Sequence, residues 1–173
     1  ESEVLYELLA PLSEDDFTRP TLFKDWTAND ILGHLHWGNM QADNSLNDEA
    51  RFLERFTAMK ELRESGAGMS MPAATKVMMD GLAGKALLEA WREFYGPMSD
   101  RFAAADPKKR VKWVGPDMSV RSSITARLME TWSHGQAAFD LFRVKRQETD
   151  RIKNVAVLGV NTFGWTFVNR GEE

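Results

Sequence analysis

Three residues in this sequence carry side chains that could hold a divalent metal ion together. Glu130 and His134 stand four residues apart in the segment LMETWSHGQAAFDLF, residues 128–142. On a helix this spacing places both side chains on one face, with their Cβ atoms about 6 Å apart. His34 falls on the apolar face of a second helix-like segment, with Ile31 and Leu35. Two imidazoles and one carboxylate form a ligand set that leaves a fourth zinc position open to water or substrate.

The same three residues also fit a purely structural role. A glutamate and a histidine one turn apart are commonly a hydrogen-bonded or solvated pair on a helix surface. A lone histidine on an apolar face is commonly a core residue with a satisfied ring nitrogen. Spacing alone therefore leaves both the metal site and the structural pair open.

Four more residues are candidates for a substrate or thiol pocket beside the metal ligands. Arg127 precedes Glu130 by about one turn, and its guanidinium could pair with a substrate carboxylate or neutralise Glu130 itself. Trp26 and Trp132 are candidate pocket walls. His36 lies about 200° around the helix from His34, so the two imidazoles cannot easily serve one site, and His36 is expected to act only as an indirect partner.

The composition excludes several classes of function. The 173 residues include no cysteine, which excludes a disulfide framework, a cysteine-ligated zinc site and a cysteine nucleophile. The net charge is −4, and basic residues cluster only in PKKRVK at 107–112, which argues against a broad nucleic-acid-binding face. No apolar run approaches the roughly 20 residues that cross a bilayer, and the start ESEVLYELLAPL has no signal-peptide pattern. We expect a cytoplasmic protein that binds small molecules.

Apolar side chains recur at helical spacing along most of the chain. Thr27 followed by Asp30 predicts the N-cap of one long helix, and Ser119 predicts the N-cap of another. Glycines at 66–68 and the pair Gly115–Pro116 predict breaks between helices. The expected helices cover residues 1–12, 28–42, 47–65, 75–105, 119–142 and, more briefly, 150–162.

Long amphipathic helices joined by long connections predict an all-α fold, a four-helix bundle with a crossover connection and an extra C-terminal helix. The alternative is an irregular all-α domain. We expect a single domain over residues 1–173. Phe163, Trp165 and Phe167 alternate in TFGWTFVNRGEE, which predicts a β-strand at 163–173 and the start of a C-terminal domain that is missing here.

Three segments together resemble one known family. DWTANDILGHLHW at 25–37 resembles the second-helix signature of DinB-like metal-binding bundles, in particular the N-terminal domain of mycothiol-dependent maleylpyruvate isomerases. RLMETWSHGQAAFDLF at 127–142 resembles the same family's Glu-Thr-Trp-x-His-Gly-Gln helix, and RIKNVAVLGVNT at 151–162 resembles the segment that follows it. The resemblance covers essentially the whole chain.

The resemblance implies metal ligands at His34, Glu130 and His134, with zinc as the ion and nickel or iron as the alternatives. It implies a thiol-dependent transferase or isomerase in which the metal activates a small-molecule thiol, and by analogy a homodimer. The alternative function is a non-catalytic, metal-stabilised binding or dimerisation domain, and a zinc-dependent hydrolase is a third hypothesis. The substrate and the thiol are left open.

Overall fold

The computed structural model describes residues 1–171 and contains, in that part of the chain, eight α-helices, two 3-10 helices and a short β-ribbon. The α-helices are α1 (Ser2–Leu9), α2 (Ala28–Asn47), α3 (Glu49–Glu64), α4 (Met71–Met78), α5 (Gly84–Ala104), α6 (Val120–Leu141), α7 (Lys153–Asn161) and α8 (Phe163–Arg170). The 3-10 helices are η1 (Asp15–Thr18) and η2 (Asp150–Ile152), and the antiparallel ribbon pairs β1 (Arg110–Val111) with β2 (Met118–Ser119). None of the helices in residues 1–171 has the length and apolar character needed to cross a membrane.

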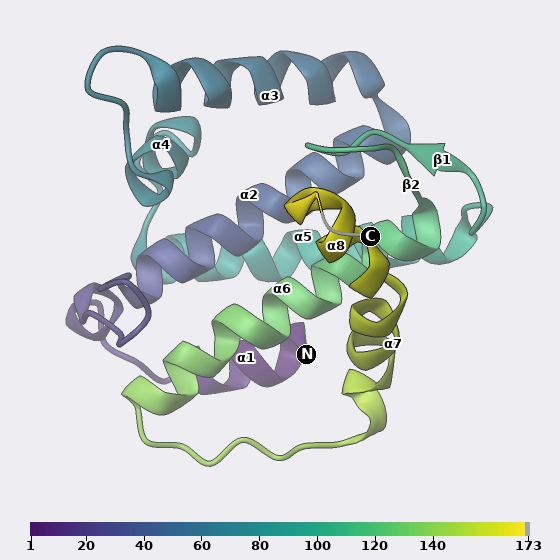
Figure 1. The fold of residues 1–173 in the computed structure, drawn as a ribbon. Helices are drawn as coiled ribbons and strands as arrows, with labels where there is room; N and C mark the ends of the chain where they lie inside the picture. The colour runs from purple at the N-terminus through teal and green to yellow at the C-terminus, as the bar shows by residue number, and fades with distance from the viewer. Residues whose placement is uncertain (172–173) are drawn as a thin grey trace.

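Helices α1, α2, α5 and α6 form a four-helix bundle (Figure 1). Two contacts show that helices α2 and α5 run parallel. Near the start of both helices, the Asn29 side chain accepts from the Gly84 N–H at 2.7 Å. Near the end of both helices, Asp43 pairs with Arg101, also at 2.7 Å. Two consecutive bundle helices can be parallel only if the chain crosses back between them. Helices α3 and α4 make that return and pack against α2, so the predicted crossover bundle is confirmed.

The bundle core is built from apolar side chains that recur at helical spacing on the inward faces. Trp91 of α5 is completely buried in it. Each large apolar side chain that is fully buried contributes about 1.5–3 kcal/mol relative to exposure. The main members are Leu5, Leu9, Phe17, Ile31, Leu32, Leu35, Leu87, Leu88, Trp91 and Phe139.

The expected helix at 75–105 is in fact two helices, α4 and α5. Asp80 and Gly81 between them have left-handed backbones, with φ of 52° and 75°. The Gly81 N–H bonds back to the carbonyl of Lys76, which closes the end of α4 as a left-handed helix terminator does. The apolar periodicity continues through this break, and for that reason the spacing alone predicted one helix.

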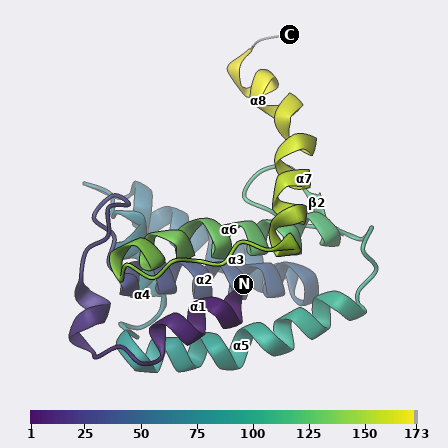
Figure 2. The same ribbon diagram turned by 90° about the horizontal axis from the view of Figure 1, so that it is seen from below.

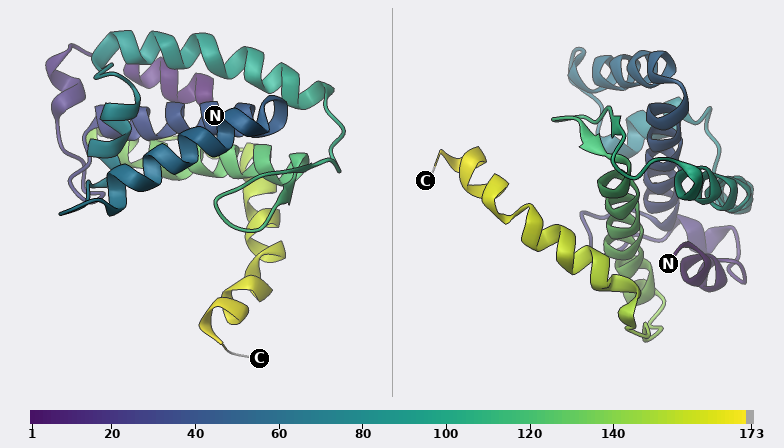
Figure 3. Two further views of the ribbon diagram at one scale, coloured as in Figure 1. Left: turned by 90° about the horizontal axis from the view of Figure 1, so that it is seen from above. Right: turned by 90° about the vertical axis from the view of Figure 1, so that its right-hand side faces the viewer.

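The predicted strand at the C-terminal end is wrong. Residues 163–170 form helix α8, which ends at Gly171 with a left-handed φ of 66°. Phe163 and Phe167 stand one turn apart with ring centroids 5.4 Å from each other, so the spacing that looked like strand alternation also fits one face of a helix. Helices α7 and α8 project away from the bundle (Figures 2 and 3). Residues 172–173 lie outside the described part.

The start of α2 is fixed by a reciprocal capping box. The Thr27 hydroxyl accepts from the Asp30 N–H at 3.1 Å, and the Asp30 carboxylate accepts from the Thr27 N–H at 2.8 Å. These bonds satisfy backbone donors that a helix start would otherwise leave unpaired. The predicted cap is confirmed, and so is the one at Ser119, whose hydroxyl accepts from the Ser122 N–H at the start of α6 without a reciprocal bond.

We expect Thr27→Ala to lower the free energy of unfolding by about 1 kcal/mol, because the substitution removes the side-chain half of the capping box. Urea denaturation measures this change. Thr27→Ser keeps the hydroxyl and should retain most of the stability. Thr57→Ala, on an exposed position of α3, serves as the control and should shift the free energy by less than about 0.5 kcal/mol. An equal loss in both alanine variants would contradict the assignment.

Candidate metal centre

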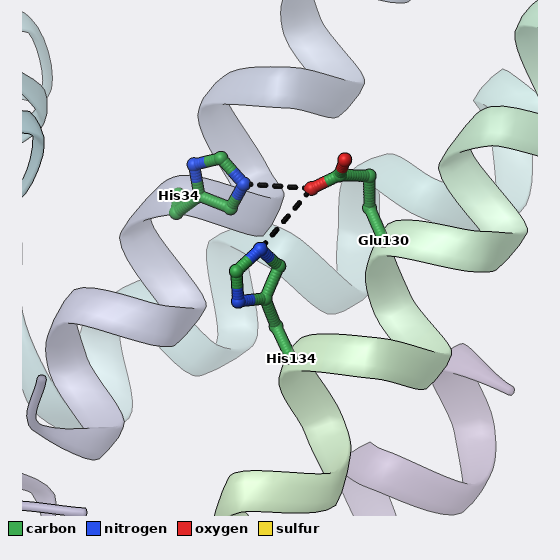
Figure 4. Close-up of side chains that lie close together, drawn as sticks. All are labelled: His34, Glu130 and His134. Atoms are coloured by element: carbon green, nitrogen blue, oxygen red, sulfur yellow. Dashed lines mark hydrogen bonds and ion pairs between the residues drawn. The ribbon is translucent and has the colours of Figure 1, made fainter. Parts of the chain in front are cut away.

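His34 of α2 meets Glu130 and His134 of α6 across the interface of these helices (Figure 4). One carboxylate oxygen, Oε2 of Glu130, lies 2.9 Å from Nε2 of His34 and 3.2 Å from Nε2 of His134. The three candidate ligand atoms all lie within 4.8 Å of one another. The structure therefore brings together the three residues that the sequence singled out.

The spacing of these atoms matches what a small divalent cation requires. Two ligand atoms bound at about 2.0–2.2 Å to a tetrahedral zinc ion lie roughly 3.3 Å apart. The two nitrogen–oxygen distances, 2.9 and 3.2 Å, are close to that value. The donor set and its spacing therefore fit a divalent metal.

The electrostatics of the cluster keep the carboxylate charged and one imidazole neutral. Hydrogen bonds from His134 and His34 hold the pKa of Glu130 far below its ordinary range, against the opposing effect of burial, and the Arg127 charge adds to the lowering. Burial lowers the pKa of His34, although the hydrogen bond to Glu130 opposes it. An ionised carboxylate and a neutral imidazole are the protonation states that bind metal ions.

Two aromatic side chains form a wall against the histidines. The Trp26 ring stacks on the His134 ring with centroids 5.6 Å apart and planes 6° apart, and it meets His34 edge-on. Phe23 packs edge-on against His134 at 5.1 Å. Trp26 therefore lies beside two of the candidate ligands, and its role as a pocket wall stays a prediction. Phe23 was not predicted, and only its place three residues before Trp26 in the same short loop could have indicated it.

A closed loop between η1 and α2 positions this wall. The Thr21 N–H donates to the Trp26 carbonyl at 2.8 Å, and Pro20 and Thr27 form an isolated β-bridge. Lys24 and Asp25 at the tip have left-handed backbones, with φ of 53° and 57°. Non-glycine residues adopt this conformation at a cost, which the bonds across the loop and the capping box of α2 offset.

Arg127 lies beside the cluster and is almost completely buried. Its charge acts on both Glu130 and His34, but no ion pair joins it to Glu130 within the described residues. Its guanidinium packs on the α2 backbone at Gly38, where an added Cβ would lie 2.6 Å from Arg127 Cζ. The absence of a side chain at Gly38 lets the guanidinium lie this close to the helix, and a Cβ there would displace it.

His36 and Trp132 face away from the three ligands. His36 is buried against Phe94 of α5, with ring centroids 5.4 Å apart. Trp132 packs under Arg146, which donates to the Trp132 carbonyl at 2.7 Å. Each of these residues stands two positions from a ligand on its own helix, a rotation of about 200° that directs the side chains to the opposite side. The expectation that they line the pocket is not met in this structure.

The sequence of this chain matches one family model over residues 1–139, that of the mycothiol maleylpyruvate isomerase N-terminal domain. The chain belongs to this family. The match includes all of α1 to α5 and α6 as far as Phe139, and thus all three candidate metal ligands. The resemblance inferred from the two helix motifs is confirmed.

Among curated proteins the chain resembles two uncharacterized proteins of Mycobacterium tuberculosis, MT0041 of strain CDC 1551 and Rv0036c of strain H37Rv. Each is 36% identical over 168 residues, which are 97% of this chain and 63% of the relative. The chain thus spans less than two thirds of the length of these relatives. No solved structure gives a significant match.

We expect the purified protein to bind about one equivalent of a divalent metal, and His134→Ala to lose it, because removing one of three protein ligands leaves only two. Elemental analysis after reconstitution measures the content. His36→Leu removes a histidine that lies outside the cluster and should keep the metal. Equal metal content in wild type and His134→Ala, or none in either, would show that the three residues are only a hydrogen-bonded cluster.

His36 predicts a pH dependence of stability that is separate from the metal. Burial lowers its pKa from 6.5 to about 4. Between these values the unfolded chain binds a proton that the folded chain does not, so the free energy of unfolding falls as the pH drops from about 6.5 to 4, by on the order of 3 kcal/mol. The stability is fully present above this window.

Urea denaturation of the metal-free protein at several pH values tests this effect. The wild type minus His36→Leu difference isolates the His36 contribution from those of His34 and Glu130, whose own pKa values are also lowered. The variant should lose less stability on acidification than the wild type. Parallel pH profiles for the two proteins would rule out the assigned role of His36.

Proposed function

We propose that this chain is the metal-binding domain of a thiol-dependent isomerase or transferase, with zinc held by His34, Glu130 and His134. The observation that carries the proposal is the convergence of two imidazole nitrogens and one carboxylate oxygen from two helices. Nickel and iron are the alternative ions, since two histidines and a carboxylate also suit them.

The three ligands are close to solvent, as a site that receives small molecules requires. The side chains of His34, Glu130 and His134 are 18%, 24% and 17% exposed. Three protein ligands leave a coordination position free. A bound zinc ion would supply the positive charge that keeps a small-molecule thiol in its thiolate form near neutral pH.

The chain's own residues would shape the reaction around that position. With Zn²⁺ bound, the single negative charge of Glu130 would leave the site a net charge of about +1 toward an incoming anion, because neutral imidazoles add no charge. Trp26 and Phe23 cover one side of His134 with apolar surface, which limits water there. With no cysteine in the sequence, the thiol has to come from outside the chain.

Family membership supports the same class of reaction. The family model takes its name from mycothiol and maleylpyruvate isomerase, and we carry over from it only the use of a thiol with an electrophilic substrate. The curated relatives extend beyond the length that this chain covers, so the activity of the whole protein belongs to this proposal too.

A zinc-dependent hydrolase is less well supported. Such an enzyme needs a general base beside the metal-bound water. Glu130 is itself one of the ligands, and no further carboxylate joins the cluster within the described residues. A metal-stabilised domain without turnover is the remaining alternative, and thiol binding separates it from the proposed function.

We expect mycothiol or glutathione to stabilise the zinc-loaded protein against thermal unfolding and to leave the metal-free protein unchanged. A thiol at one hundred times its dissociation constant should add about 2.7 kcal/mol. The S-methylated thiols, which cannot form a thiolate, and the His134→Ala variant serve as controls and should show no effect. Unchanged stability of the zinc form with every thiol would favour the domain without turnover.

A further inference from the structure

A cavity of about 470 Å³ has Arg127 in its wall and is lined by residues of α1, α2, α5, α6 and α7. This volume is within the range of small-molecule sites. The cavity does not include the three metal ligands in its walls, although Arg127, Leu128 and Thr131 in its wall flank Glu130 on α6. The polar side chains that matter most in its wall are those of Asn39, Tyr95 and Arg127.

The Arg127 guanidinium lacks a matching acceptor. The residue is 5% exposed, and its Nε and Nη2 atoms are buried without a hydrogen-bond partner in the described residues. The carboxylate of Glu130 acts on the Arg127 charge. Its Oε2 atom, however, already contacts the imidazoles of both His34 and His134. A buried cation without a paired acceptor is costly to the fold, so this arginine is not explained as a stabilising contact.

Asn39 adds a second buried polar group to the same cavity. It is 2% exposed, and residues 1–171 provide no hydrogen bond to its side-chain amide. The neighbouring Gly38 is the residue on which the guanidinium rests, so the amide and the guanidinium belong to the same stretch of the α2–α6 interface. Together they offer N–H donors from two helices.

The acidic residues on the cavity wall are already matched by cations or donors. The Glu1 carboxylate pairs with both Arg146 and Arg151. The Glu3 carboxylate accepts from the Tyr95 hydroxyl at 2.5 Å and lies 3.9 Å from Arg92. The unmatched charge at the cavity is therefore the positive charge of Arg127.

We propose that this cavity binds the carboxylate of a small molecule, with the Arg127 guanidinium as its ionic partner and the Asn39 amide as a further donor. A carboxylate supplies the charge and the acceptor oxygens that Arg127 lacks, and the charge-assisted hydrogen bonds to it are the strong ones. Gly38 leaves room for the guanidinium to lie close to the backbone of α2.

The place of the site suggests its use. Arg127 precedes Glu130 by three residues on α6, and its charge acts on both Glu130 and His34, so the carboxylate site and the candidate metal site share this helix. Its role as the anchor of a substrate or of the thiol rests on the proposed function, whereas the carboxylate site itself does not depend on the metal.

Titration with succinate, followed by calorimetry on the metal-free and the zinc-loaded protein, tests the proposal. We expect saturable binding to both forms and at least tenfold weaker binding to Arg127→Gln. Arg121→Gln, at an exposed position of the same helix, should bind as the wild type does. Succinamide, which has the same shape without the charge, should not bind. Succinate binding that survives Arg127→Gln, or that requires zinc and is lost in His134→Ala, would overturn the proposal.

Two further variants distinguish a loss of binding from misfolding of Arg127→Gln. Asn39→Asp places a carboxylate inside the cavity, and we expect it to raise the midpoint of thermal unfolding and to abolish succinate binding. Arg127→Met should unfold no earlier than the wild type, because it removes an unpaired buried charge. Clear destabilisation by Arg127→Met, or normal succinate binding to Asn39→Asp, would assign Arg127 a structural role instead.

The outcomes separate this site from the proposed function. Succinate binding through Arg127 without any thiol effect supports the carboxylate site and rejects the thiol-dependent reaction. A thiol effect without succinate binding does the reverse. If both are found, inhibition of turnover by succinate shows which carboxylate the site holds: competition with the electrophile identifies the substrate, and competition with the thiol identifies the cofactor.

Discussion

The Glu130 carboxylate lies between an imidazole of α2 and an imidazole of its own helix, one oxygen being 2.9 and 3.2 Å from the two nitrogens. This charge is partly buried, and burial on its own would favour the neutral acid. Its ionised state depends on His134, His34 and, at longer range, Arg127. A divalent cation held by these three groups would replace the protons between them. The arrangement of α2 against α6 is therefore inseparable from the charge that they enclose.

Local features of the backbone keep this interface in register. The capping box at Thr27 determines where α2 begins, and so which side of the helix carries His34. The loop before it turns through Lys24 and Asp25 to bring Trp26 against both histidines. Gly38 lets a buried arginine pass between the helices one turn farther on. The capping box, the loop and the glycine each involve only a few consecutive residues, but each of them helps to determine the contact between α2 and α6.

The sequence predicted the features that repeat locally. The N-caps at Thr27 and Ser119, the helices that follow them and the pair formed by Glu130 and His134 all depend on spacings of three or four residues. The place of His34 on the apolar face of its helix made it a candidate third ligand, and the family resemblance then supported the pairing, since nothing local relates residues 96 positions apart.

Features that depend on tertiary packing could not be predicted in this way. Asp80 and Gly81 end a helix although the apolar pattern continues across them. The aromatic residues near the C-terminal end fit a strand and a helix equally well by spacing, and the structure has the helix. Phe23 reaches His134 only because its loop closes on itself. Helix geometry does place His36 and Trp132 away from the ligands, because each stands two positions from a ligand on its own helix, but it does not give their partners, Phe94 and Arg146.

The 96-residue separation of His34 and Glu130 also has a consequence for folding. A cation held by both residues would act as a cross-link between the first third and the last third of the chain. In the chain-entropy model a covalent link closing a loop of about 100 residues contributes on the order of 4.7 kcal/mol. Helices α3, α4 and α5 all lie within this loop. In that model a cation held at both ends would restrict the unfolded chain over more than half of its length, so it would stabilise the fold mainly through the unfolded state.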